Sequence, residues 1–201
     1  MTPGKMTKMT KTTKKTRNRK AAKLTIKRAD ETHAPALHAL ITANLEEGRL
    51  LPRTLSEIAV HAERFTIVLR GRKMVGCAEL APLSAQVAEV RSLAVDAAER
   101  GHGVGTLLVD NLRQRALEEG FDKLSAFTHA PGYFSQMGFS IVPHVWMQEK
   151  IFTDCVKCPS FRRCGQYAMV VPLDGASVGE PVVTTIPLDR LRQGDGSQAR
   201  A

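Results

Sequence analysis

The sequence predicts a single α/β (α+β) domain in which helices flank a mixed sheet. Strand-like and helix-like patterns alternate between residues 24 and 173. This stretch of about 150 residues is long enough to enclose one hydrophobic core. The composition, with 43% hydrophobic and 24% charged residues, is typical of a globular protein. We therefore expect a folded domain over 24–173, a tail at 1–23 and a second tail at 174–201.

The first third of the domain is predicted to hold one strand and two helices. Residues 24–27 alternate apolar and polar side chains, as a short strand does. A helix follows, marked by apolar residues at helical spacing, which are Leu37, Leu40, Ile41 and Leu45. We expect it to end at Gly48. A second helix begins at Thr54, because Thr54-Leu55-Ser56-Glu57 has the form of a capping box.

Three strands are predicted in the middle of the domain. Residues 65–69 and 74–80 are apolar runs on either side of Gly71-Arg72, which is the pattern of a hairpin. Residues 87–95 form the third run. A glycine-rich turn over 101–105 then leads into the next helix.

The last part of the domain alternates helices and strands again. Apolar residues on one face predict a long helix that ends at Gly120, namely Val104, Leu107, Leu108, Leu112 and Ala116. We expect a strand over 123–128, a short helix over 131–137, a strand over 139–142 and a last strand over 167–173. No element is predicted between 142 and 167.

The net charge of +9 belongs to the N-terminal tail. Residues 1–23 hold nine of the 29 Lys and Arg residues and no Asp or Glu, which leaves 20 basic and 20 acidic residues in the rest of the chain. Few apolar groups stand there to offset the entropy of ordering, so we expect disorder. For residues 174–201 we expect a flexible tail, with an edge strand at 182–186 as the weaker alternative.

The basic tail also suggests a rival function, a nucleic-acid-associated module recruited by residues 1–23. Polycations bind phosphate backbones in a salt-sensitive way that ignores base sequence. The tail lacks the interleaved aromatic residues of a base-stacking platform. We therefore expect any binding of nucleic acid through it to be weak.

The distribution of apolar residues and the number of cysteines indicate the cellular compartment of the protein. No apolar run approaches the ~20 residues of a membrane-spanning helix, and the N-terminus lacks the apolar stretch of a secretory signal. Four Cys residues in 201 do not suggest a disulfide scaffold. We expect a cytoplasmic protein without a membrane partner.

The glycine-rich turn is the most informative segment. An apolar strand runs into Arg100, then three alternating glycines and an amphipathic helix. Glycines let backbone N–H groups converge, and the helix N-terminus adds unpaired donors and partial positive charge, which suits a phosphate. The spacing is not that of a dinucleotide fingerprint, and the Lys of a P-loop is missing. A plain connector remains the alternative to a phosphate site.

Arg100-x-x-Gly103-x-Gly105, after a Leu-Ala-Val-Asp strand, resembles the pyrophosphate-binding motif of the GNAT superfamily of acetyl-CoA-dependent N-acetyltransferases. Residues 133–139 are similar to the short helix and Gly-Phe turn of that superfamily. The resemblance implies a mostly antiparallel mixed sheet and acetyl-CoA as co-substrate. It implies coenzyme contacts from the strand and the turn, namely Leu93, Ala94, Val95, Arg100, Gly101, His102, Gly103, Val104, Gly105 and Thr106.

Four further segments resemble the short amino-acid N-acetyltransferases of the N-acetylglutamate synthase type. They are residues 50–54, 88–93, 127–128 and 150–155. The resemblance implies transfer of an acetyl group to an amino acid, first of all L-glutamate, in arginine biosynthesis. Another small amine or a peptide remains the alternative acceptor, and a homodimer is left open.

The resemblance also points to catalytic candidates. Glu89, on the strand before the glycine turn, is the candidate base, with Glu79 as a weaker competitor. The amide near Leu93 would stabilise the oxyanion. Many members of the superfamily have a Tyr that protonates the leaving thiolate where this chain has Phe134. N-acetylglutamate synthases often share this difference and have a hydroxyl at the end of the preceding strand, which corresponds to Thr128. The resemblance therefore favours Thr128, with Tyr133, next to Phe134, as a second candidate.

An amino-acid acceptor brings carboxylates, so its site should contain cations. Arg53, Arg91 and Lys150 lie in the family-like segments and are the candidates for substrate binding. The alternative for each is an ordinary surface ion pair.

The cysteines raise the question of a metal. A structural zinc site needs four ligands, and only three Cys residues are close in sequence, Cys155, Cys158 and Cys164. His144 or Cys77 would have to complete the set. We expect reduced thiols and no metal.

Overall fold

The computed structural model describes residues 23–45 and 50–173. Gly48, the predicted end of the first helix, lies outside the described residues. So do both predicted tails apart from Lys23, including the alternative strand at 182–186.

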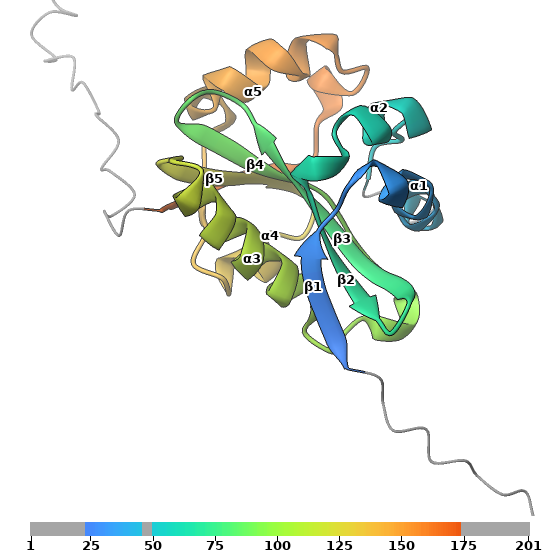
Figure 1. Ribbon diagram of the computed structural model, residues 1–201. Coiled ribbons are helices and arrows are strands. Elements are labelled where there is room, and N and C mark those ends of the chain that lie inside the picture. The colour runs from blue at the N-terminus through green and yellow to red at the C-terminus, as the bar shows by residue number, and fades with distance from the viewer. Residues whose placement is uncertain (1–22, 46–49, 174–201) are drawn as a thin grey trace, which may run out of the picture.

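Within the described residues, seven strands form one sheet in the order β1-β2-β3-β4-β5-β7-β6 (Figure 1). Neighbouring strands are antiparallel except for β4 and β5, which are parallel. The mixed, mostly antiparallel sheet is therefore confirmed. The strands are β1 Leu24–Arg28, β2 Phe65–Arg70, β3 Lys73–Pro82, β4 Val87–Val95, β5 Lys123–Thr128, β6 Ser140–Val142 and β7 Tyr167–Pro172.

Helices cover both faces of the sheet (Figure 1). The α-helices among the described residues are α1 Ala34–Ala43, α2 Leu55–Val60, α3 Val104–Glu118, α4 Pro131–Ser135 and α5 Gln148–Thr153. Short 3-10 helices lie at Glu31–His33, Ala62–Arg64, Ala97–Glu99, His144–Trp146, Cys155–Lys157 and Phe161–Arg163. The predicted helix at Thr54 is confirmed, because the Thr54 hydroxyl accepts a hydrogen bond from the Glu57 N–H at 3.2 Å.

The two faces of the sheet bury different clusters. On one face, Val68, Ala88 and Val90 pack with the apolar side of α3. On the other face, Phe65 and Ile67 pack with α1 and with Ile58 of α2. Because side chains alternate along a strand, the central strands β2, β3 and β4 contribute to both clusters.

The same alternation positions the candidate site. Val87 belongs to a third cluster with Met147, just before α5, so odd-numbered residues of the first half of β4 face the α5 side. Glu89 and Arg91 follow Val87 at intervals of two. Their side chains therefore lie on the face that α5 covers rather than on the face of α3.

One described segment differs from the prediction. Residues 143–166, for which no element was predicted, contain α5 and three 3-10 helices. Each of these elements has six residues or fewer, which is too short for a helical period to stand out in sequence. This segment carries Lys150, so the sequence could not place that residue in space.

Candidate active site

The glycine turn connects β4 to α3. Gly101 and Gly103 both have left-handed backbone angles, with φ of 76° and 80°. Gly103 is the N-cap of α3, and no side chain caps this end of the helix. The first N–H groups of a fifteen-residue helix therefore remain available to an anion, as the phosphate prediction requires.

The three glycines of the turn are required for two different reasons. At Gly101 and Gly103 a Cβ would meet nothing within 4 Å, so the constraint there is the backbone angle. At Gly105 a Cβ would lie 2.6 Å from the hydroxyl oxygen of Tyr133. Gly105 is thus needed for a close approach, which the sequence spacing could not reveal.

Arg100 is anchored at the entrance of the turn. Its Nη2 donates to the side-chain oxygen of Asn44 at 2.7 Å, and its Nε donates to the carbonyl of Val95 at 3.3 Å. Asn44, the C-cap of α1, is a residue that the sequence did not suggest. His102 is exposed at the surface of the turn.

A strand edge opens beside this turn. The pairing of β4 with β5 stops at Val90 and Ala126, so Arg91 to Val95 have no strand partner on the β5 side among the described residues. The register between β3 and β4 shifts at the same point, where Ser92 takes a left-handed φ of 49°. Leu93 and Val95 are half-buried along this edge, which suits main-chain hydrogen bonds to an extended ligand.

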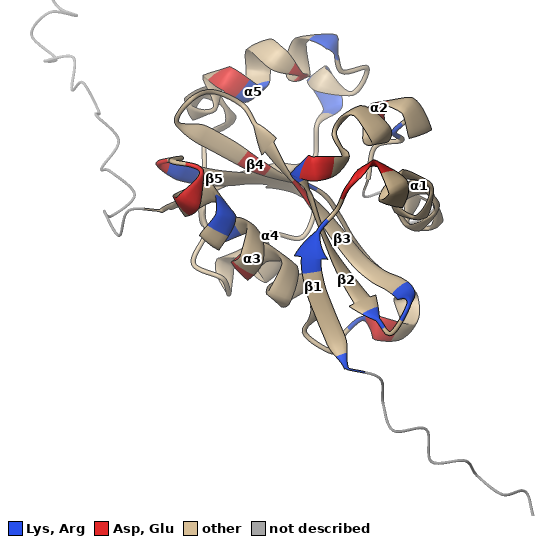
Figure 2. Cartoon of the chain, viewed as in Figure 1, with Lys and Arg blue, Asp and Glu red and all other residues tan. Residues whose placement is uncertain are grey.

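Four charged side chains close a ring over β4, which we call the charge ring: Glu89, Arg91, Lys150 and Asp154. Lys150 Nζ lies 2.8 Å from both carboxylate oxygens of Glu89 and 2.9 Å from Oδ2 of Asp154. Arg91 donates through Nε to Glu89 at 2.6 Å and through Nη2 to Asp154. Acidic and basic residues mark both β4 and α5 in Figure 2. Each carboxylate of the ring therefore contacts the same two cations.

The ring is buried at one end and open at the other. The Glu89 side chain is 4% exposed and the Asp154 side chain 37%. The ring of Phe127 supports Lys150, whose Nζ lies 5.1 Å from its centroid. Burial opposes the charge on Arg91, but the carboxylates of Glu89 and Asp154 outweigh it and raise the pKa of Arg91.

Arg53 forms a second group beside the ring. Its Nη1 donates to Glu79 at 2.7 Å and to the Ser92 hydroxyl at 3.3 Å. Its Nε lies 2.6 Å from a Glu57 oxygen but is not directed at it, so this buried N–H has no hydrogen-bond acceptor among the described residues. Glu79 lies opposite Arg91 across β3 and β4. The three predicted cations thus lie over neighbouring positions of one sheet face.

The two candidates for thiolate protonation occupy different places. Thr128 ends β5, and its hydroxyl accepts a hydrogen bond from the Ala130 N–H at 3.0 Å. The Tyr133 hydroxyl is buried against the glycine turn beside Gly105 and Thr106. Burial raises the pKa of Tyr133, and the nearby Thr106 side chain opposes that shift.

The cysteines are all free thiols. Cys77 is fully buried, and this burial raises its pKa to about 12. Cys155 and Cys158 are half-buried and Cys164 is exposed. Over residues 23–45 and 50–173, no group of three or more His, Cys, Asp or Glu side chains is arranged to hold a metal ion. In the same ranges no helix is long and apolar enough to cross a membrane.

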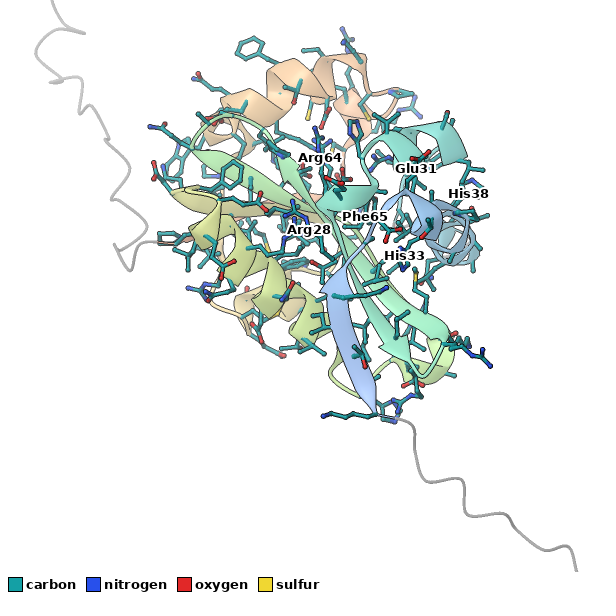
Figure 3. The ribbon with its side chains drawn as sticks, viewed as in Figure 1. Arg28, Glu31, His33, His38, Arg64 and Phe65 are labelled. Atoms are coloured by element: carbon teal, nitrogen blue, oxygen red, sulfur yellow. The ribbon has the colours of Figure 1, made fainter. Side chains whose placement is uncertain are left out.

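A surface depression lies elsewhere, between the end of β1 and α2. Arg28, Glu31 and Arg64, labelled in Figure 3, belong to its lining. None of the predicted site residues lines it. Arg28 is engaged there, since its Nε donates to the carbonyl of Glu63 at 2.6 Å and its guanidinium pairs with Glu119.

Two residues that sequence reasoning missed complete the arrangement, Asn44 and Asp154. The signal for Asp154 was its spacing of four from Lys150, which places both on one side of a helix. It could be used only if α5 had been predicted. Nothing in the sequence around Asn44 indicated a contact with Arg100, which lies 56 positions further on.

Comparison with known proteins matches this chain to acetyltransferases. The sequence profile of the acetyltransferase (GNAT) family matches residues 26–139. An uncharacterized N-acetyltransferase of Chlorobaculum tepidum is 31% identical over 153 residues, which are 76% of this chain and 99% of that protein. An amino-acid acetyltransferase of Mycobacterium tuberculosis is 28% identical over 134 residues, covering 64% of this chain and 75% of the relative.

The fold also matches a solved structure. N-acetylglutamate synthase from Neisseria gonorrhoeae, complexed with coenzyme A and N-acetyl-glutamate, superposes with a TM-score of 0.62 and 24% sequence identity. The match covers 77% of this chain and 36% of that one. At this identity the likeness concerns the fold.

Proposed function

Since the chain belongs to the acetyltransferase (GNAT) family and is an acetyl-CoA-dependent N-acetyltransferase, we propose that it acetylates the amino group of an amino acid, with L-glutamate as the first candidate. The observation that supports this acceptor most directly is the convergence of Arg91 and Lys150 in the charge ring. Arg53 lies nearby, across Glu79 and Ser92. An acceptor with two carboxylates can pair with such cations, whereas a polyamine has no carboxylate to offer them.

The coenzyme side of the proposal rests on the turn and the open strand edge. Acetyl-CoA supplies an activated acetyl thioester. The backbone amides from Arg100 to Thr106 would hold its pyrophosphate, because this end of α3 has no side-chain cap. The edge at Leu93, Ala94 and Val95 would position its extended arm. The backbone geometry of these residues fits the pyrophosphate and the extended arm of acetyl-CoA.

Glu89 is proposed as the base that takes a proton from the acceptor's ammonium group. Its carboxylate lies beside Arg91 and Lys150. The acceptor's amine would therefore lie against Glu89, while its carboxylate would pair with Arg91 and Lys150 in the same site. Thr128, at the end of β5, is the proposed proton donor for the leaving sulfur. Tyr133, packed against Gly105, is better placed to support the turn.

N-acetylglutamate, the proposed product, would place the enzyme in arginine biosynthesis in the cytoplasm. The Mycobacterium tuberculosis and Neisseria gonorrhoeae relatives carry the names amino-acid acetyltransferase and N-acetylglutamate synthase. These names support an amino acid as acceptor without extending to this chain by themselves. A homodimer remains a prediction.

The test incubates the full chain with acetyl-CoA and single amino acids, polyamines and peptides, and follows the release of CoA. We expect turnover with L-glutamate and weaker turnover with L-glutamine, which lacks one carboxylate. Mass spectrometry of the product checks that the acetyl group is on the amino nitrogen. Turnover of polyamines or peptides without turnover of glutamate would replace the amino-acid proposal by another small amine or peptide as acceptor.

A further inference from the structure

Asp154 is the most exposed member of the charge ring. We propose that its carboxylate holds the place of the acceptor's carboxylate between Arg91 and Lys150 and leaves when the acceptor binds. Asp154 would then determine specificity, by setting how tightly a carboxylate-bearing acceptor is held. This inference rests on the proposed function of the same site.

The two carboxylates of the ring, Glu89 and Asp154, have the same two partners. Glu89 contacts both Arg91 and Lys150, and Asp154 contacts the same two cations. A third carboxylate can therefore satisfy Arg91 and Lys150 only by replacing one of these two. The charge of the ring is unchanged by such a replacement, because one carboxylate leaves as another arrives.

Burial decides which carboxylate leaves. The Glu89 side chain is 4% exposed and contacts its cations at 2.6 to 2.8 Å, so removing it would leave cations and a strand carboxylate unpaired. The Asp154 side chain is 37% exposed and stands at the solvent side of the ring. An exposed carboxylate is rehydrated when it leaves its partners, so its release costs little.

The backbone allows Asp154 to turn away. Asp154 is the C-cap of α5, with φ −122° and ψ −47°, outside the helical region. Its N–H still donates to the carbonyl of Lys150 at 3.0 Å, which holds the backbone while the side chain changes rotamer. In the absence of acceptor, Asp154 keeps both cations neutralised and so avoids the penalty of a partly buried unpaired charge.

The experiment compares the full-length wild type with Asp154→Asn, which keeps the shape and removes the charge. Glu149→Gln is the matched control, since it removes one negative charge from the same helix outside the ring. Two quantities are measured: the KM for L-glutamate, and the Kd of glutarate by calorimetry. Glutarate carries the two carboxylates of glutamate without an amine, so its binding is read without turnover.

We expect Asp154→Asn to lower both the KM for glutamate and the Kd of glutarate about two- to fivefold, the range of a partly exposed ion pair. Glu149→Gln should leave both values at those of the wild type, and the KM for acetyl-CoA should not change in either variant. An unchanged or weaker affinity for glutarate in Asp154→Asn would overturn the proposal, because Asp154 would then only position the cations.

Two further outcomes keep the inference separate from the proposed function. If the wild type does not acetylate glutamate but Asp154→Asn still binds glutarate more tightly, the acceptor is wrong and the role of Asp154 stands. If Asp154→Asn does not fold, Asp154→Glu takes its place. Its longer carboxylate reaches further between Arg91 and Lys150, so the Kd of glutarate must rise, and an equal or lower value contradicts the proposal.

Discussion

The hydroxyl oxygen of Tyr133 lies 2.6 Å from the position that a Cβ atom on Gly105 would occupy. These two residues come from α4 and from the first turn of α3, so the contact fixes the distance between the short helix and the glycine turn. Gly105 has no left-handed backbone angle, and its glycine is required only by this neighbour.

We therefore predict that Gly105→Ala destabilises the protein by about 1–3 kcal/mol, the usual cost of overpacking. Adding Tyr133→Phe removes the hydroxyl and leaves the ring carbon at 3.4 Å, so the double variant should recover most of the loss. Urea unfolding measures both. Gly132→Ala, where a Cβ meets nothing within 4 Å, is the control and should be close to neutral. A double variant no more stable than Gly105→Ala would show that the hydroxyl is not the obstacle.

Gly103 and Gly120 stand at opposite ends of α3 with nearly equal left-handed angles, φ 80° and 82°, and open space around each. Either substitution by Ala should cost about 1–2 kcal/mol of stability, the penalty of a left-handed L-residue. Only Gly103→Ala should also raise the KM for acetyl-CoA, because only Gly103 shapes the N-terminal turn. Equal KM values in the two variants would argue that the coenzyme does not bind at this turn.

Glu89→Gln removes the proposed base. We expect kcat to fall by a factor on the order of 10² to 10⁴, the usual contribution of a general base. Glu79→Gln tests the competing base. Glu79 lies on β3 opposite Arg91, two residues along β4 from Glu89, and contacts Arg53. Steady-state rates with saturating acetyl-CoA and acceptor decide between them. If Glu79→Gln loses more kcat than Glu89→Gln, Glu79 is the better candidate.

The buried thiol of Cys77 predicts a dependence of stability on alkaline pH. Its pKa is raised by burial from 9.0 to about 12, so the folded protein keeps a proton that the unfolded chain loses above pH 9. The free energy of unfolding should then fall as the pH rises from 9 to 12, by at most ~1.4 kcal/mol per pH unit from this group. Urea titrations of wild type and Cys77→Ala at several pH values isolate the effect. Parallel curves for the two proteins would assign the alkaline loss to other groups.

Deleting residues 1–23 separates the enzyme from the nucleic-acid alternative. This segment holds nine basic residues and none of the candidate site residues, so kcat and both KM values should remain those of the full chain. Any binding of a DNA or RNA duplex at low salt should be lost with the deletion, because the rest of the chain has equal numbers of basic and acidic residues. Retained binding would place a nucleic-acid surface on the domain itself.

The sequence by itself determined the strands, the longer helices and the glycine turn, but not the short helices of residues 143–166. Alternation of side chains is a local property, so the hairpin around Gly71 and the strands 87–95 and 123–128 could be predicted without knowing their neighbours. The same holds for most of the amphipathic face of α3, where Val104, Leu108, Leu112 and Ala116 are buried as predicted. Leu107 was predicted on this face and is exposed instead, because it lies one position before Leu108 and so outside the buried stripe. The turn from Arg100 to Thr106 was recognisable because its glycines stand at fixed spacing, and the backbone angles of Gly101 and Gly103 require glycine.

Only the tertiary structure decided the partners of the charges. Arg91 meets Asp154 across 63 positions and Lys150 meets Glu89 across 61, and the helix that brings them there is six residues long. A helix of that length is stabilised by its packing and leaves little periodic signal. Arg91 and Lys150 each contact two carboxylates because α5 brings Lys150 and Asp154 over Glu89 on the sheet. The resemblance and side-chain type could therefore propose Arg53, Arg91 and Lys150, but not divide them between the charge ring and the group around Glu79.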